Sequence, residues 1–361
     1  MATQAERLRE ISTHIWTFEV FKTCSYAGFA VDPNDYLRTE DARFSPLGKR
    51  IAMTVQNRIL LLEIDLTCMP LRVTRHTELY SAGLAFPHGV EFLTEDLIVV
   101  ANREAWMTFF RLPPVDTWED RTDIEAIHEF GAPWFGARKA TRIISTGRKV
   151  RCGPGSVRLH GDNLYICANN ANTVSKHPLS MTDSNINIGE GTLLAQDGLD
   201  ILDGIAISPD GRLIALADAG NNRVVILPSN GGAFTCVMRD PLLHSPHGLC
   251  FDPSGRALYV SDAGEPLVHV FESPDGRWIT DTERSAFSQR GISEEAFTKT
   301  KLSVPEEFRP LVGGLKGLDI DPSGRFLVGT CLNQPLSFFD TLEGTAESAG
   351  AASLLTVGNK I

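Results

Sequence analysis

The chain has 361 residues, 42% of them hydrophobic, and a formal net charge of −11 at pH 7. This acidic balance argues against nucleic-acid binding, which depends on neutralising many phosphates. The sequence has no apolar run near the roughly 18 residues of a membrane span, no apolar signal-peptide core, and no C-x-x-C pair among its seven cysteines. We therefore expect a cytoplasmic protein with reduced thiols, no membrane association and no nucleic-acid partner.

In chain order, the sequence repeats a short apolar run, a turn rich in Pro and Gly, and a second apolar run. The copies lie at 40–64, 87–102, 153–174, 202–227, 245–264 and 315–339. In SPHGLCFDPSGRALYVSDAG (245–264), for example, the Asp-Pro-Ser-Gly turn separates two β-rich runs. A further run, such as RVVILP at 223–228, follows each pair. The pattern predicts units of three or four short antiparallel strands.

Aligning the copies gives one corresponding position per unit, which is followed by glycine in four of the six: Glu40, His88, Gly155, Asp203, His247 and Lys316. Most intervals match the roughly 40–50 residues of a four-stranded propeller blade, and two are about 20 residues longer. We predict an all-β, six-bladed β-propeller of four-stranded antiparallel blades, forming a single domain over 1–361 with repeats at 40–340. The insertions are expected at 104–150 and 273–312. A ring of five or seven blades, or a β-sandwich, is the alternative.

Residues 14–21 alternate like a strand, and we expect this N-terminal segment to close the ring by completing the last blade with 354–357. The first insertion is rich in aromatic residues, which fit either a lid over the channel mouth or packing against a blade: Trp106, Phe109, Phe110, Trp118, Trp134 and Phe135. The second contains a stretch, 292–311, that alternates charged and apolar residues and is expected to be partly helical.

The repeated pattern, with ADAGNNRV (217–224) as its clearest instance, resembles the NHL-repeat and gluconolactonase (senescence-marker-protein) group of propellers. This resemblance implies a small-molecule enzyme such as a lactonase or lyase, although some NHL proteins are interaction platforms. The two Pro-His-Gly copies are similar to those of the peptide-amidating lyase, which implies that His88 and His247 bind zinc in the channel. The calcium-binding set of the lactonase branch is not clearly present: Glu40, in the weakest repeat, is not matched to its glutamate, and its other ligands have only approximate counterparts in Asn102, Asn169, Asn170, Asp218 and Asp262.

The first strand of each propeller blade lines the axis, so the aligned positions form a ring in which units two and five face each other. His88 and His247 are then expected to share a metal with Asp203, and Glu40 is a weaker candidate ligand. This set suits Zn, Fe, Mn or Ni, and the resemblance adds Ca. Lys316 is expected to stabilise a developing oxyanion. The hypothesis is a metal-assisted, lactonase-like hydrolase or a lyase acting on a small molecule.

Two alternatives remain at this point. One is a metal-free cyclase or isomerase that uses His88, His247, Asp203 and Lys316 as acid–base groups. The other is a non-catalytic propeller that binds a protein or a ligand. For Asp218 and Asp262, near the ends of second strands, the favoured interpretation is a structural bond to backbone N–H groups of the following turn. The oligomeric state does not follow from the sequence.

Overall fold

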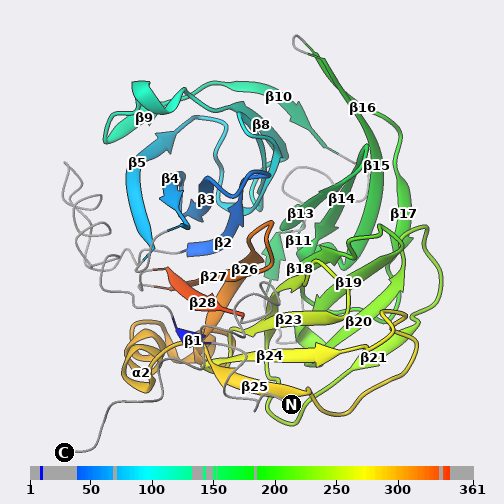
Figure 1. Ribbon diagram of the computed structural model, residues 1–361. Coiled ribbons are helices and arrows are strands. Elements are labelled where there is room, and N and C mark those ends of the chain that lie inside the picture. The colour runs from blue at the N-terminus through cyan, green and yellow to red at the C-terminus, as the bar shows by residue number, and fades with distance from the viewer. Residues whose placement is uncertain are drawn as a thin grey trace, which may run out of the picture.

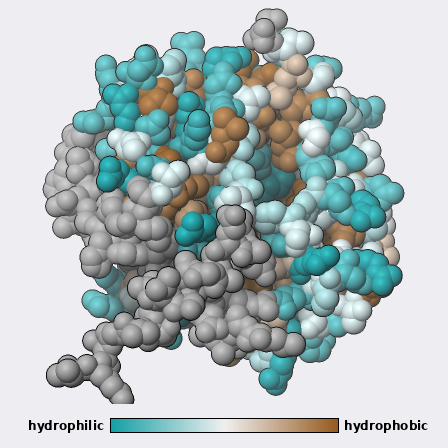
Figure 2. All heavy atoms as spheres, viewed as in Figure 1, coloured by the Kyte–Doolittle hydropathy of each residue, from teal (hydrophilic) through white to brown (hydrophobic). Residues whose placement is uncertain are grey.

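Six sheets of four or five strands stand around a common axis in the computed structural model, which confirms the six-bladed propeller (Figure 1). The structure describes residues 9–10, 39–67, 71–131, 141–143, 149–151, 153–182, 185–332 and 336–341. None of the helices in these ranges is both long and apolar enough to cross a membrane. Seen from the side of Figure 1, the surface carries several separate hydrophobic patches among hydrophilic residues (Figure 2).

The blades follow one another along the chain. Blade one contains β2 (Thr39–Phe44), β3 (Arg50–Val55), β4 (Arg58–Asp65), β5 (Arg72–Tyr80) and β9 (Arg121–Asp123). Blade two contains β6 (Pro87–Thr94), β7 (Leu97–Asn102), β8 (Met107–Arg111) and β10 (Ala126–Phe130). Blade three contains β13 (Ser156–His160), β14 (Asn163–Ala168), β15 (Thr173–Thr182), β16 (Asn185–Ile188) and β17 (Thr192–Ala195).

The second half of the ring has the same organisation. Blade four contains β18 (Leu202–Ile207), β19 (Leu213–Asp218), β20 (Arg223–Pro228) and β21 (Cys236–Met238). Blade five contains β22 (Pro246–Phe251), β23 (Ala257–Asp262), β24 (Leu267–Glu272) and β25 (Phe287–Arg290). Blade six contains β26 (Leu315–Ile320), β27 (Phe326–Cys331), β28 (Ser337–Asp340) and β1 (Arg9–Glu10).

The ring closes through both ends of the described chain. β1 pairs antiparallel with β28, with Arg9 opposite Asp340, so the N-terminal segment supplies the outer strand of blade six. The segments 14–21 and 354–357, which we expected in this role, lie outside the described residues. The first strands touch in the order β2, β6, β13, β18, β22, β26 and again β2, and thus surround the axis.

Apolar packing follows the same circle. One large cluster of buried residues lies between each pair of neighbouring blades, such as Met53 and Val328 between blades one and six. The P-x-G turns that join first and second strands need their glycines, because Gly211, Gly255 and Gly324 have φ of 71°, 71° and 77°. Local turn chemistry and blade-to-blade burial therefore account for the repeat.

The two predicted insertions contain blade strands. The range 104–150 holds β8 and β10 of blade two, as well as β9, which pairs in parallel with β5, and a separate hairpin of β11 (Thr141–Ile143) and β12 (Lys149–Arg151). Phe109 and Phe110 are buried in β8, and Trp106 and Trp118 pack against the clusters on either side of blade two. These four residues pack the blades rather than form a lid, whereas Trp134 and Phe135 lie outside the described residues.

The second range, 273–312, holds β25, helix α2 (Glu294–Leu302) and a 3-10 helix, Glu306–Leu311. The helix begins where the Ser293 hydroxyl accepts a hydrogen bond from the Ala296 N–H, with Glu294 and Glu295 in its first turn. The expected partial helicity of 292–311 is confirmed.

Candidate functional site

A β-bulge recurs at the start of the first strands. The pairing register with the second strand shifts between Pro87 and Gly89, between Leu202 and Gly204, and at the corresponding places in blades one, five and six. Each shift includes an aligned ring position: Glu40, His88, Asp203, His247 or Lys316. Bulges re-aim side chains and are common beside functional sites, so the repeat presents five polar groups at one level of the ring.

Glycine follows the ring residue in blades two, four, five and six, and there the neighbouring blade requires it. A Cβ on Gly89 would lie 2.6 Å from the carbonyl oxygen of Gly155, and one on Gly204 would overlap the carbonyl oxygen of His247. A Cβ on Gly248 would likewise overlap the carbonyl oxygen of Lys316. The x-Gly step in the sequence thus marks close backbone contact between blades.

Hydroxyl side chains on the second strands connect the bulges around the ring. Thr54 accepts a hydrogen bond from the Asp41 N–H at 2.8 Å and donates to the His88 carbonyl at 3.0 Å. Ser261 accepts from Gly248 and donates to the Lys316 carbonyl. Each hydroxyl joins the backbone of its own blade to that of the next, which fixes where the ring side chains lie.

Glu40 Oε2 is the centre of the site. It lies 2.6 Å from Lys316 Nζ, 3.5 Å from His88 Nε2 and 3.9 Å from His247 Nε2. All four residues are buried, and the two imidazole rings are 5.4 Å apart between centroids. The fold therefore brings four of the predicted site residues into direct contact.

The orientation of His88 leaves one ring nitrogen available. Its Nδ1 lies 2.7 Å from the carbonyl oxygen of Gly155, and because a carbonyl only accepts, Nδ1 carries the proton. Nε2 of the neutral ring is then a lone-pair acceptor that faces another acceptor, Glu40 Oε2. This nitrogen is buried and has no hydrogen-bond partner among the residues that the structure describes. Two facing acceptors at this distance call for a proton or a cation between them.

Both histidines are held in the neutral form. Burial lowers the pKa of His88 well below its usual range, and the nearby positive charge of Arg103 lowers it further. Burial also lowers the pKa of His247, with Lys316 and Arg103 acting in the same direction against Asp203 and Glu40. At neutral pH the pair is therefore in the state that binds a metal or accepts a proton.

Asp203 lies in the ring but faces other partners. Its Oδ1 accepts hydrogen bonds from Arg103 at 2.9 Å and from the Asn169 amide at 3.0 Å. The described residues that bring one ligand atom each within 4.8 Å of the others are Glu40, His88 and His247. In the group of potential metal ligands, Glu40 thus takes the place that we had predicted for Asp203.

The third blade has no side chain at the ring position, and a neighbour fills the gap. A Cβ on Gly155 would overlap the side chain of Asn169, which comes from the end of the second strand. Asn169 is fully buried, and its Oδ1 has no hydrogen-bond partner. Asn169 and Arg103 complete the polar ring; from the sequence, Asn169 was named only as an approximate counterpart of a calcium ligand, and Arg103 was not named.

The other strand-end carboxylates have structural roles. Asp262 accepts from the backbone N–H groups of His244 at 2.8 Å and Ser245 at 3.0 Å, and Asp218 accepts from Asp200 N–H at 2.8 Å. Both side chains fix the loops that lead into first strands. The expected bond to the following turn is found for Asp262, which also accepts from the N–H groups of Gly264 and Glu265, whereas the backbone partner of Asp218 lies in the preceding loop.

A second set of charged residues lies further along the same first strands. Arg43 contacts Asp41 at 3.1 Å and Asp319 at 3.3 Å, and Arg158 lies 3.9 Å from both Asp41 and Glu91. Burial raises the pKa of the Asp41, Glu91 and Asp319 carboxyl groups despite these arginines. The pKa of Glu91 is raised well above its usual range, and that of Asp319 to about 6.

Asp319 gives a test of this second set. Folding raises the pKa of Asp319, so its protonation favours the folded state. The stability gained in this way is complete below about pH 3.8, and it is lost as the pH rises through about 6. The shift of about two pKa units corresponds to at most about 3 kcal/mol. We expect Asp319→Asn to remove this part of the pH dependence, measured by urea denaturation from pH 4 to 7. The exposed control Asp123→Asn should keep the wild-type profile, and an unchanged profile in Asp319→Asn would contradict the assignment.

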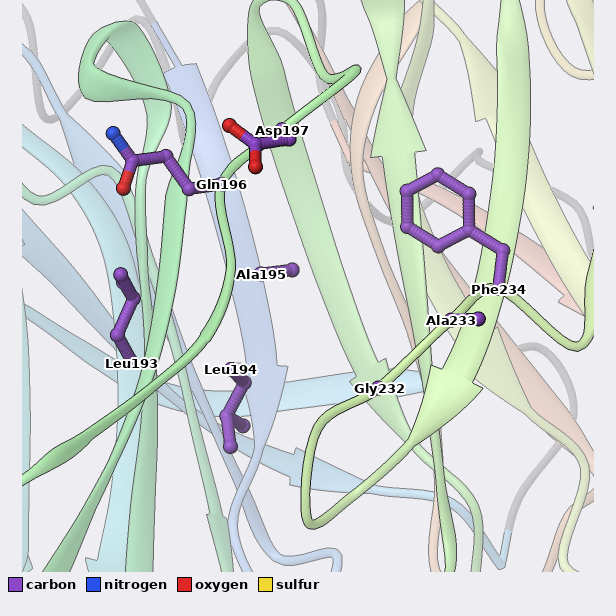
Figure 3. A pocket seen from close by; sticks show the side chains of 8 residues that line it. All are labelled: Leu193, Leu194, Ala195, Gln196, Asp197, Gly232, Ala233 and Phe234. Atoms are coloured by element: carbon purple, nitrogen blue, oxygen red, sulfur yellow. The ribbon is translucent and has the colours of Figure 1, made fainter.

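A groove elsewhere is separate from the ring. It lies between β17 and the loop that joins β20 to β21, and Leu193, Leu194 and Phe234 form its apolar part (Figure 3). Among the described residues that line it, Asp197 alone is ionisable. The groove therefore offers no group of side chains comparable to that around Glu40.

Comparisons with known proteins agree with the architecture. No protein-family profile and no curated protein sequence matches this chain. Among solved structures, a luciferin-regenerating enzyme is similar, with 13% identity and a TM-score of 0.54 over 85% of this chain and 92% of that one. A chain of the nidogen/laminin complex (16% identity, 70% and 80% covered) and Hsv2 of Kluyveromyces lactis (13%, 82% and 90%) each have a TM-score of 0.46. At these identities the likeness concerns the fold, a β-propeller that is also found in an enzyme.

Proposed function

We propose that the protein is an enzyme that acts on a small organic molecule at the ring, as a metal-assisted, lactonase-like hydrolase or a lyase. The observation that carries the proposal is the buried Nε2 of His88, which has no hydrogen-bond partner in the described part of the chain and faces Glu40 Oε2 at 3.5 Å. An unpaired buried nitrogen opposite a carboxylate is costly unless a ligand joins them.

The donor set fits a transition-metal ion held by His88, His247 and Glu40. Ligand atoms about 2.1 Å from one ion at tetrahedral angles are about 3.4 Å apart, and the two N–O distances here are 3.5 and 3.9 Å. The bond from His88 Nδ1 to the Gly155 carbonyl is the outer contact that metal-binding histidines usually make. Two imidazoles and a carboxylate favour Zn, Fe, Mn or Ni, whereas Ca prefers oxygen ligands.

The surrounding residues supply the remaining chemistry. A bound ion would act as a Lewis acid and make a water molecule more acidic. Asp203, at the same level of the ring, can accept a proton, and Arg103 and Asn169 hold its carboxylate in place. The Lys316 ammonium can stabilise negative charge on a substrate oxygen. The luciferin-regenerating enzyme is a precedent for an enzyme of this shape.

One observation favours a metal-free alternative. Lys316 Nζ already provides a cation 2.6 Å from Glu40 Oε2. A cyclase or isomerase would then use His247 and Asp203 as acid–base groups, with Lys316 as the electrostatic partner of a developing anion.

Metal analysis of the purified, tag-free protein separates the two. We expect about one equivalent of a transition metal in the wild type and almost none in the His88→Ala/His247→Ala double variant, because three ligands become one. The control His76→Ala/His128→Ala, on outer strands, should keep its metal. A folded wild type that remains metal-free after exposure to Zn, Fe, Mn and Ni would refute the metal-assisted function and favour the alternative.

A further inference from the structure

The second set of charged residues stands three positions after the ring residues in the sequence. In blades one to six this position holds Arg43, Glu91, Arg158, Ala206, Cys250 and Asp319. The charged members meet across blade boundaries, with 3.3 Å from Arg43 to Asp319 and 3.9 Å from Arg158 to Glu91. Charged side chains therefore connect blades six and one, and blades two and three, along the first strands that surround the axis.

Arg158 stands between two carboxyl groups and is hydrogen-bonded to neither. Its Nη1 lies 3.9 Å from Asp41 Oδ2 and 3.9 Å from Glu91 Oε2, and it donates its hydrogen bond to the carbonyl oxygen of Val157 at 2.5 Å. The side chain of Arg158 is 10% exposed, and those of Asp41 and Glu91 are 9% and 15% exposed. Direct hydrogen bonds from arginine to carboxylate are about 2.7–2.9 Å long, so a shift of about 1 Å would pair Arg158 with either group.

The two carboxyl groups differ in their other partners. Asp41 Oδ1 lies 3.1 Å from Arg43 Nη2, and Asp41 Oδ2 accepts a hydrogen bond from the Val90 N–H at 3.2 Å. Within the described residues, Glu91 accepts no side-chain hydrogen bond, and the cation nearest to it is Arg158. An ionised Glu91 therefore has the greater need of Arg158, whereas a protonated Glu91 leaves Arg158 to Asp41.

The surroundings of Glu91 favour a bound proton. The charged residues of other strands that act on it are Arg43 and Asp41 of β2, Arg158 of β13 and Asp319 of β26. β3 and β7 also pack against β6, but β7 has no charged residue, and Arg50 of β3 donates to the Glu95 carbonyl at 2.8 Å. Burial raises the pKa of Glu91 well above its usual range; Arg43 lowers it, and the two aspartates raise it further. Glu91 thus keeps a proton at pH values where an exposed glutamate is ionised.

We propose that Glu91, Arg158 and Asp41 form a proton-controlled switch beside the ring. Arg158 pairs with Glu91 when that carboxyl is ionised, which joins blades two and three, and it turns to Asp41 of blade one when Glu91 carries a proton. The Asp41 carboxylate follows Glu40 in the chain and also acts on His247, so the ring site experiences the position of Arg158. The switch requires no metal and is independent of the metal-assisted function.

Urea denaturation of the full-length protein from pH 4 to 9 tests the bound proton. Glu91→Gln is neutral at every pH and should match the wild type at pH 4. Because folding raises the pKa of Glu91, the stability that its proton provides is complete below about pH 4.3 and is lost as the pH rises through the folded-state pKa. At pH 9, Glu91→Gln should therefore exceed the wild type by about tenfold or more in the folding equilibrium constant. The exposed control Glu129→Gln should stay within about twofold of the wild type throughout.

Double-mutant cycles test the movement of Arg158. Glu91→Gln and Arg158→Met, alone and combined, should show a coupling below about twofold at pH 5 and of about tenfold at pH 9. At pH 9 the coupling of Asp41→Asn with Arg158→Met should rise about fivefold when Glu91→Gln is also present, because Arg158 then has one carboxylate to pair with instead of two. The control pair Asp96→Asn and Arg111→Met, half-exposed and 2.8 Å apart, should show the same coupling at both pH values, below about fivefold.

Three results would each overturn the switch. They are a Glu91→Gln profile that follows the wild type to pH 9, a coupling between Glu91 and Arg158 that is equal at pH 5 and 9, and a coupling between Asp41 and Arg158 that does not respond to Glu91→Gln. Because Arg158→Met can lose stability, its folding is checked by circular dichroism, and the Glu91→Gln profile stands without it.

Discussion

Glutamine in place of Glu40 is expected to lower the free energy of unfolding by about 3–5 kcal/mol, because it removes one partner of a buried ion pair. The Lys316 ammonium is 6% exposed and lies 2.6 Å from Glu40 Oε2. In the variant this ammonium would stay buried after losing the Glu40 carboxylate. Urea denaturation followed by circular dichroism measures the effect in wild type and variant.

A double-mutant cycle shows whether the loss belongs to the pair. Removing both charges, in Glu40→Gln/Lys316→Met, should recover most of the stability that either single substitution loses. Glu294→Gln is the matched surface control: Glu294 contacts Arg290 at 2.6 Å, but both side chains are more than half exposed, so a loss below about 1 kcal/mol is expected. Equal losses in Glu40→Gln and Glu294→Gln would contradict the central role of the Glu40 pair.

The fold could be predicted because its signals are local and repeated. Each blade depends on two apolar runs and a P-x-G turn, and the turn glycines have the positive φ that such turns require. The third and fourth strands were harder to assign, because their burial depends on neighbouring blades. Thus β8, which carries Phe109 and Phe110, was taken for part of an insertion.

The site could be predicted as a set of positions but not as a geometry. Glu40, His88, Asp203, His247 and Lys316 share one place in the repeat, and the recurring bulge directs them to one level. Which of them meet depends on groups from other blades: Arg103 and Asn169 hold Asp203, which leaves Glu40 facing the histidines. A single sequence carries no signal for such a choice.

Part of what was missed had a signal in the sequence. Thr54, Asn169, Ser261 and Thr330 stand at a constant spacing after Glu40, Gly155, His247 and Lys316, and a polar side chain recurs at this place in an otherwise apolar second strand. Three of these four are the hydroxyls that link neighbouring blades. Arg103 has no such signal, because it belongs to the turn after the second strand of one blade only.

The close approach of blades gives the second large effect. Gly204→Ala is expected to lower the free energy of unfolding by about 3 kcal/mol or more, since overpacking against rigid backbone cannot be relieved by a rotamer change. The added methyl would overlap the His247 carbonyl oxygen of the next blade. To accommodate it, β18 and β22 must separate, which also moves Asp203 and His247.

The control for this prediction is Gly161→Ala, in the turn between β13 and β14. Gly161 has a φ of +54° but nothing within 4 Å of the added Cβ, so the expected loss is only the backbone strain of about 1 kcal/mol. Thermal and urea denaturation of both variants compare a steric clash between blades with strain in an open turn. If Gly204→Ala lost no more stability than Gly161→Ala, the repeated x-Gly step would not be a requirement of blade packing, and the alignment of the ring residues would need another cause.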